Sequence, residues 1–174
     1  MGNLMFISER LQRSSRFYHR EARKCLRGGA FLAACVMQAA ALEGLLLAMC
    51  FLYPTEIRTT SMYQRRAKRG FRRKRNKALD FNYAELINIA AELSWFPPKR
   101  IAVWGRRTNL AGFVHELRDL RNYVHPGVLA PKDKPVKFTK GVFNVVFEIF
   151  EVANSWLLNR VEDSIRQDLE RKRR

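Results

Sequence analysis

The chain of 174 residues fits a single domain, 1–174, and its 47% hydrophobic residues are enough for a buried core. It contains 33 Lys and Arg residues against 16 Asp and Glu residues, a formal net charge of +17. A fold does not need this charge, which adds self-repulsion, so the composition indicates a polyanionic partner, either nucleic acid or an anionic membrane surface.

The first ten residues contain no apolar stretch followed by a small-residue cleavage site, so no signal peptide is expected. Cys25, Cys35 and Cys50 are odd in number and have no metal-ligand spacing with one another or with histidine. We therefore expect reduced cysteines that serve packing, a cytoplasmic location, and neither a metal nor another cofactor.

Prolines and glycines separate apolar-periodic stretches, which predicts an all-α fold, a bundle of about five helices with no strand. A basic insert separates the second helix from the third. Asn82 and Glu85 form a capping box at the start of the third helix, and Pro54 and Pro126 follow the second and fourth. The expected helices span residues 4–26, 30–52, 82–95, 108–125 and 139–165, and a charged tail follows at 166–174.

The second predicted helix, 30–53, is long and apolar enough to suggest a membrane span. However, Gln38 and Glu43 lie inside it, and a carboxylate at the centre of a bilayer costs about 3 kcal/mol. We expect a central helix buried in a bundle or dimer, and a membrane-anchored protein is the alternative.

Residues 58–77 form a strongly basic segment with ten Lys and Arg residues and no acidic residue. Such a density predicts phosphate neutralisation without sequence preference, and Tyr63 and Phe71 could stack on bases. A solvated loop, an anionic-membrane patch and a nuclear-localisation signal are the alternatives. The candidate RNA-binding residues are Arg65, Arg66, Lys68, Arg69, Arg72, Arg73, Lys74, Arg75 and Lys77.

The fourth predicted helix carries the most specific pattern. Arg118, Asn122 and His125 are spaced i, i+4, i+7 and share one stripe, and Arg121 lies one turn before His125. The stripe is rotated about 90° from the apolar seam, which places it at the edge of the core. Histidine transfers protons near neutral pH, and arginine stabilises charge on phosphate, so the pattern suits metal-free phosphodiester cleavage. A simple C-cap histidine beside solvated arginines is the alternative.

The segment from Arg118-Asp119 to His125-Pro126 resembles the motif of the HEPN superfamily, in which four to six residues separate an Arg from a His. Six residues separate Arg118 from His125, whereas only three separate Arg121 from His125. The stretch Leu42-Glu43-Gly44-Leu45-Leu46 is similar to a helix that precedes the motif helix in many family members. The resemblance and its helix order cover most of residues 4–165.

The resemblance implies a helical homodimer in which two motif helices meet across a cleft, and metal-independent endoribonuclease activity in toxin–antitoxin or defence systems. It also implies an acidic supporting residue, for which Glu43 is the candidate. Alternatively, Glu43 pairs with Arg118 or Arg121 and holds two helices in register. Gly127 stands where toxins controlled by a nucleotidyltransferase antitoxin carry a modified tyrosine, and the basic insert is not part of the minimal fold.

We therefore expect an endoribonuclease that cleaves RNA through 2′-OH attack, with a protein regulator or antitoxin as a further partner. His125 would be the general acid/base and Arg118 the phosphate clamp, and Arg121 and Asn122 would position the substrate. A non-catalytic module that keeps the fold and binds RNA or another partner is the second hypothesis.

Overall fold

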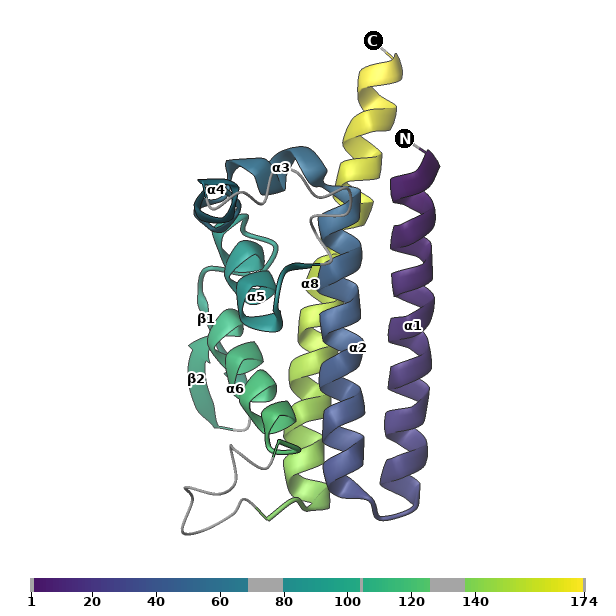
Figure 1. The fold of residues 1–174 in the computed structure, drawn as a ribbon, viewed down its shortest axis with the longest axis vertical. Coiled ribbons are helices and arrows are strands. Elements are labelled where there is room, and N and C mark those ends of the chain that lie inside the picture. Colours follow the sequence, from purple (N-terminus) through teal and green to yellow (C-terminus); the bar gives the residue numbers. More distant parts are fainter. Residues whose placement is uncertain (1, 69–79, 104, 126–136, 174) are drawn as a thin grey trace.

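Three long helices form the main layer of the molecule (Figure 1). The computed structural model describes residues 2–68, 80–103, 105–125 and 137–173. Helix α2 lies between the other two in Figure 1, and α1 packs along one side of it. The three helices are α1 (Gly2–Arg27), α2 (Phe31–Leu52) and α8 (Lys140–Arg173).

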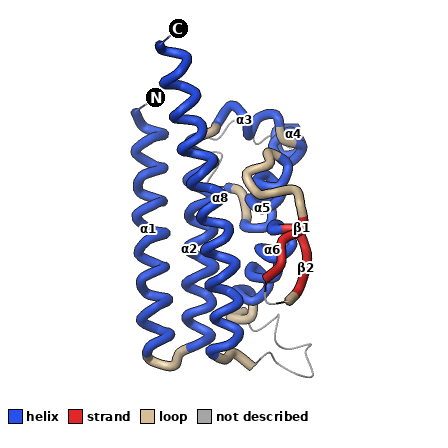
Figure 2. The backbone as a smooth tube through the Cα atoms, turned by 180° about the vertical axis from the view of Figure 1, so that it is seen from behind, coloured by secondary structure: helices blue, strands red, loops and turns tan. Residues whose placement is uncertain are grey.

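A second layer of short elements covers the side of α2 that faces away from α1, as Figures 1 and 2 both show. Helices α5 and α6 pack on each other and on α2, and α6 also packs on α8. A two-stranded antiparallel hairpin lies at the outer edge. The elements are α3 (Pro54–Thr59), α4 (Ser61–Lys68), α5 (Tyr83–Glu92), β1 (Arg100–Val103), β2 (Arg106–Asn109) and α6 (Leu110–Asn122).

The close packing of α1 on α2 depends on small and hydroxyl side chains. Ser8 and Ser15 are buried on α1 and donate hydrogen bonds to the carbonyl oxygens of Ala48 and Ala41, at 3.2 and 2.7 Å. A Cβ added at Gly44 would lie 3.5 Å from Leu11 O and from Ser15 Cβ, so only a small side chain fits there. Together these contacts hold the apolar helix α2 against α1.

The largely helical fold is confirmed, but two of its details were predicted wrongly. The described residues contain seven helices instead of about five: Pro54 ends α2 and opens α3, and α4 lies within the segment that was expected to be a basic insert. They also contain a hairpin where no strand was expected. Gly105 turns that hairpin with φ +72°, and only Ile101 and Val103 of β1 face the core.

The cysteines are free and two of them are buried, as predicted. Burial raises the pKa of Cys35 and of Cys50 to about 12, so both stay protonated thiols at neutral pH. Among the described residues, α2 and α8 are long and apolar enough to cross a membrane. Of the most apolar window of α2, 56% is already buried inside the chain, which fits the predicted core helix.

Candidate functional site

Helix α6 carries the predicted motif and is fixed to the core along its apolar face. The Asn109 side chain caps its first turn by accepting a hydrogen bond from the Gly112 backbone N–H at 2.8 Å. Leu110, Phe113 and Leu117 are buried. Val124 was expected on the same seam but is 46% exposed, since α6 has already ended at Asn122.

The predicted stripe lies at the edge of the core. Arg118 and Asn122 are half-buried and His125 is exposed. After α6, hydrogen bonds from Tyr123 N–H to Leu120 O and from His125 N–H to Asn122 O continue the chain as a tighter turn. His125 is therefore held by its backbone, and its side chain is open to solvent.

The spacing along α6 limits which side chains can act together. His125 comes seven positions after Arg118, about 10 Å of helix rise, whereas it comes four positions after Arg121, about 6 Å by the same measure. The long Arg118 side chain can span part of that distance, so a phosphate over Asn122 is within reach of both Arg118 and His125. Arg118 Nε now donates to the Asp119 carboxylate at 3.0 Å, a partner that a phosphate would have to replace.

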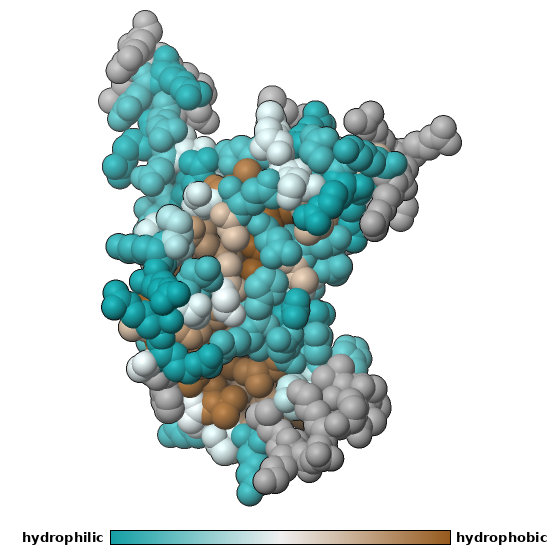
Figure 3. Space-filling model, turned by 90° about the vertical axis from the view of Figure 1, so that its left-hand side faces the viewer, coloured by the Kyte–Doolittle hydropathy of each residue, from teal (hydrophilic) through white to brown (hydrophobic). Residues whose placement is uncertain are grey.

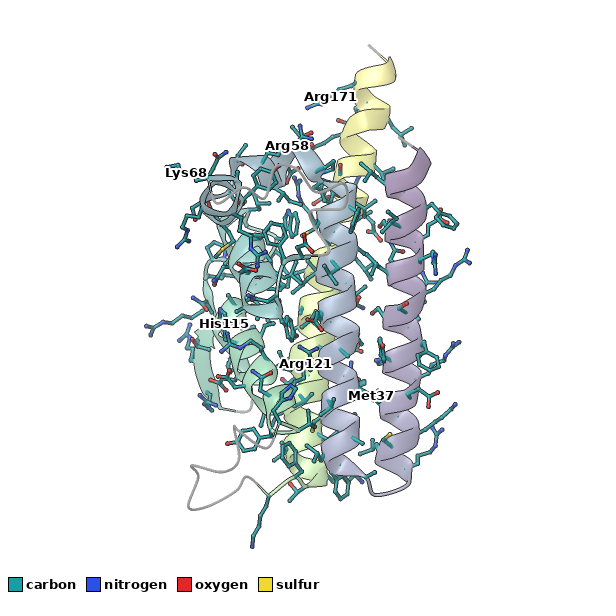
Figure 4. The ribbon with its side chains drawn as sticks, in the orientation of Figure 1. Met37, Arg58, Lys68, His115, Arg121 and Arg171 are labelled. Carbon is teal, nitrogen blue, oxygen red and sulfur yellow. The ribbon has the colours of Figure 1, made fainter. Side chains whose placement is uncertain are left out.

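Arg121 reaches from α6 to α2 and pairs with Glu43. Its two terminal nitrogens lie 3.1 and 3.4 Å from the two carboxylate oxygens of Glu43. Figure 4 shows Arg121 between the α6 and α2 ribbons. Burial raises the pKa of the Glu43 carboxyl, and the Arg121 cation opposes this shift. This contact matches the predicted alternative in which Glu43 holds two helices in register.

Tyr83, which the sequence did not single out, completes this cluster. The guanidinium carbon of Arg121 lies 5.9 Å from the centre of the Tyr83 ring. The Tyr83 hydroxyl is buried and has no hydrogen-bond partner within the described part of the chain. Burial, and then the Glu43 carboxylate, raise its pKa well above the usual value, so the phenol stays protonated. A tyrosine at the start of an amphipathic helix is usually a core residue. Nothing in the sequence therefore indicated that Tyr83 would contact Arg121.

His115 is a second histidine beside the motif, one turn before Arg118. Its Nε2 lies 3.1 Å from the Asn88 amide oxygen, an arrangement in which Nε2 carries the proton. Burial and then the Arg118 cation lower the pKa of His115, and Asp119 raises it. His115 comes three residues before Arg118, and this i, i+3 spacing could have indicated from the sequence that the two side chains interact. His115 and His125 are ten residues apart, about 15 Å, so they cannot serve one phosphate together.

Replacing Arg118 with Ala should raise the pKa of His115, because the substitution removes one of the two causes that lower it. Asp119→Ala should lower it further, since that carboxylate favours the imidazolium. Titration of the His115 ring followed by NMR measures both shifts. Arg107→Ala, an exposed hairpin arginine, is the control with no shift expected. An unchanged His115 pKa in Arg118→Ala would place the two side chains too far apart to interact.

The predicted RNA-binding segment is described only in part. Arg65, Arg66 and Lys68 lie on α4, where Arg66 pairs with Glu85 and the other two are exposed. Tyr63 is half-buried against the core, which leaves less of its ring for stacking than was expected. In Figure 4 Lys68 lies at the far end of the second layer from Arg121. The remaining predicted residues, Arg69, Arg72, Arg73, Lys74, Arg75 and Lys77, and Phe71, lie outside the described residues.

The hairpin adds basic residues that the sequence analysis missed. Arg100 and Arg107 occupy its exposed face, where the register places Arg107 opposite Ala102 and therefore diagonal to Arg100. Lys99 precedes them and is also exposed. The face of the molecule in Figure 3 is mostly hydrophilic, apart from apolar areas at mid-height and near the lower end.

No group of three or more His, Cys, Asp or Glu side chains suited to a metal ion occurs in the described ranges. Comparisons with protein-family models, with curated proteins and with solved structures each found no match to this chain. The resemblance to the HEPN superfamily therefore remains a prediction from the motif and from the Leu-Glu-x-Leu-Leu stretch.

Proposed function

We propose that the protein is a metal-independent endoribonuclease of the HEPN type, whose site is formed by Arg118, Asn122 and His125 at the end of α6. The observation that carries this proposal is the position of Arg118, Asn122 and His125. They lie at the edge of the core, with Arg118 and Asn122 half-buried at the end of α6 and His125 exposed just after it. The proposal includes a cytoplasmic location, a homodimer and a protein regulator.

The proposed reaction is an attack by the ribose 2′ oxygen on the adjacent phosphorus. A bond forms between phosphorus and O2′ and the bond to O5′ breaks, which leaves a 2′,3′-cyclic phosphate and a 5′-hydroxyl. His125 takes the proton from the 2′-hydroxyl as base or gives one to O5′ as acid, and water carries out the other of these two proton transfers. Arg118 exchanges Asp119 for the phosphate oxygens and stabilises the charge that develops on them.

Arg121 takes a positioning role in this proposal, because its guanidinium is already occupied by Glu43. That pair fixes the last turns of α6 to α2, so the backbone of His125 is held in place relative to the core. Asn122 lies between Arg118 and His125 and has an amide suited to a ribose hydroxyl or a phosphate oxygen.

A non-catalytic RNA-binding module is the second candidate, and one observation favours it. The motif arginine Arg118 and the supporting Arg121 already have carboxylate partners, Asp119 and Glu43. A site in which the phosphate clamp is neutralised binds RNA through the basic surfaces of α4 and the hairpin instead. In that case His125 has no chemical role.

Incubation of the purified protein with end-labelled RNA in excess EDTA tests the first proposal. We expect cleavage that EDTA does not slow, with products ending in a 2′,3′-cyclic phosphate when analysed by mass spectrometry. Binding without cleavage would support the second candidate. Cleavage that stops with EDTA would contradict the assignment of the chemistry to this chain's own side chains.

The basic insert is expected to supply much of the RNA affinity. Replacing Arg72, Arg73, Lys74 and Arg75 with Gln should flatten the salt dependence of binding. The log–log slope should fall by up to about 3 if each charge neutralises one phosphate of a single strand. Four exposed α1 residues, Arg10, Arg13, Arg23 and Arg27, give a charge-matched control whose slope should barely change. Equal slopes for both variants would mean that the insert does not contact RNA.

A further inference from the structure

A cavity of about 500 Å³ lies between α1 and α8, with α2 as its floor. The two outer helices each pack on α2, and Figures 1 and 2 show the start of α1 beside the end of α8. The described residues that line the cavity come from these three helices, and none of them belongs to the candidate site on α6. The cavity is therefore a separate feature, and what it binds does not depend on the proposed RNA cleavage.

Contacts between the three helices show which lining residues lie at each end of the cavity. His19 of α1 stacks on Phe150 of α8, with ring centroids 5.0 Å apart, and both side chains line the cavity. Toward the other end of α2, the Tyr53 hydroxyl lies 3.5 Å from the Arg160 carbonyl oxygen. The cavity therefore runs from a level near His19 and Phe150 to a level near Tyr53 and Arg160.

The end of the cavity at His19 carries several hydrogen-bond donors. The Gln38 amide donates to His19 Nδ1 at 3.1 Å, so Nε2 carries the ring proton and has no hydrogen-bond partner in the described chain. Arg16 and Arg20 also line the cavity, are exposed, and form no ion pair with a described residue. Among the described residues of the lining, Glu151 is the single acidic one. Two cations and an N–H donor against one carboxylate suit an anionic group.

The opposite end of the cavity is apolar. Met49 and Leu52 of α2 line it together with Leu157, Leu158 and Val161 of α8. Leu158 is 51% exposed, so water contacts an apolar side chain in this part of the groove. Covering such a surface with hydrocarbon is favourable in proportion to the apolar area removed from water. The groove therefore has one end rich in donors and one end suited to an apolar chain.

The volume of the cavity indicates how much hydrocarbon fits. A methylene group occupies nearly as much space as a water molecule in the liquid, about 30 Å³, so a cavity of about 500 Å³ holds roughly 16 carbon atoms. This is the size of one long alkyl chain. Nucleic acid does not match the groove, because its polar backbone would lose water against apolar walls without gaining hydrogen bonds there.

We propose that the groove binds one long-chain fatty acid, with its carboxylate beside Arg16 and Arg20 and its alkyl chain toward Leu158. A carboxylate accepts charge-assisted hydrogen bonds from guanidinium groups, and the His19 Nε2–H supplies a further donor at the same end. The alkyl chain covers the apolar end, including the exposed part of Leu158. The groove thus matches an amphipathic anion at both of its ends.

Calorimetric titration of the full chain with decanoate, dodecanoate, tetradecanoate and hexadecanoate, each below its aggregation concentration, tests the proposal. One fatty acid should bind per chain. Each added methylene removes further apolar surface from water, so the dissociation constant should fall about tenfold for every two carbon atoms. Hexadecyltrimethylammonium has the same chain length and a cationic head, and it should bind at least about tenfold more weakly than hexadecanoate.

Variants at the donor-rich end test the position of the carboxylate. The double substitution Arg16→Glu and Arg20→Glu should raise the dissociation constant for hexadecanoate about 100-fold, because it replaces two cations by two anions. Arg13→Glu with Arg23→Glu is the charge-matched control, at exposed α1 residues outside the lining, and should leave the constant nearly unchanged. All four side chains are exposed, so both variants should keep the helical circular dichroism of the wild type.

A second pair of variants tests the apolar end. Leu158→Glu places a carboxylate where the alkyl chain is proposed to lie and should also raise the dissociation constant about 100-fold. Leu169→Glu is the matched control, at a 53% exposed leucine of the same helix outside the lining, and should bind hexadecanoate like the wild type.

Several results would overturn the proposal. A wild type that does not bind hexadecanoate, an affinity that does not depend on chain length, or equal binding of the cationic amphiphile would each do so. Equal effects of a variant and its matched control would show that the fatty acid binds elsewhere. A wild-type dimer that Leu158→Glu dissociates in sedimentation would show that a second copy of the chain covers the groove instead.

Discussion

His125→Ala is expected to reduce the rate of RNA cleavage about 100-fold or more while RNA affinity changes little. The imidazole is exposed, so its loss removes no core packing, and the backbone hydrogen bond of His125 to Asn122 remains. Single-turnover cleavage of labelled RNA at saturating protein measures the effect, and a binding assay in the same buffer confirms the affinity.

Variants at Arg118 show whether the phosphate clamp is correctly assigned. Arg118→Ala should reduce the rate to a similar extent, and Arg118→Lys should restore only part of it, because a point charge lacks the planar fork. His115→Gln is the matched control for loss of a neighbouring imidazole and should keep most of the activity. If His125→Ala keeps full activity, or if His115→Gln loses more activity than His125→Ala, then His125 is not the group that transfers the proton.

Glu43→Ala is expected to lower the free energy of unfolding by about 2 kcal/mol. The side chains of Arg121 and Glu43 are 34% and 20% exposed, so removing the carboxylate leaves a partly buried guanidinium without its partner. Urea denaturation followed by circular dichroism measures the change.

The hairpin provides a matched pair for this experiment. Arg106 and Glu116 also form a two-point contact, at 2.7 Å, but their side chains are 67% and 41% exposed. Glu116→Ala should therefore cost under about 1 kcal/mol. Equal losses for Glu43→Ala and Glu116→Ala would show that burial adds nothing to the α2–α6 contact.

The pH dependence of stability gives a further test of Glu43. Because burial raises its folded pKa, the folded state holds the Glu43 proton more tightly than the unfolded state. Its contribution to stability is therefore largest below the unfolded value and is lost as pH rises through the folded value. Glu43→Gln should remove this loss and flatten the stability profile above about pH 4, the usual value for an unfolded glutamate.

Local chemistry explains which elements were predictable. Asn82 and Glu85 form the predicted capping box, with Asn82 Oδ1 accepting from Glu85 N–H at 3.0 Å, because both partners are three residues apart in the sequence. The hairpin was missed because each strand has four residues, too few for an alternating pattern to be distinguished. The charged end of the last helix, 166–174, was expected to fray, but α8 continues to Arg173.

The sequence could predict only the part of the candidate site whose residues lie close together in the chain, and not the contacts made by other helices. Spacing alone predicted Arg118, Asn122 and His125 on one stripe of a helix that ends at His125, but α6 ends at Asn122 and His125 follows in a turn. The partner of Arg121 comes from α2, 78 residues away, and was foreseen only as one of two roles for Glu43. Tyr83 could not be foreseen, since its importance depends on a buried hydroxyl that lacks a partner among the described residues.

Cleavage of matched substrates tests the central claim most directly. The protein is incubated in EDTA with an RNA and with the same sequence fully 2′-O-methylated, and both binding and cleavage are measured. We expect similar binding to the two, cleavage of the RNA to 2′,3′-cyclic phosphate ends, and none of the methylated strand, because the attacking hydroxyl is blocked. Cleavage of both strands, or of neither, would contradict an α6 site that cleaves RNA through its own 2′-hydroxyl.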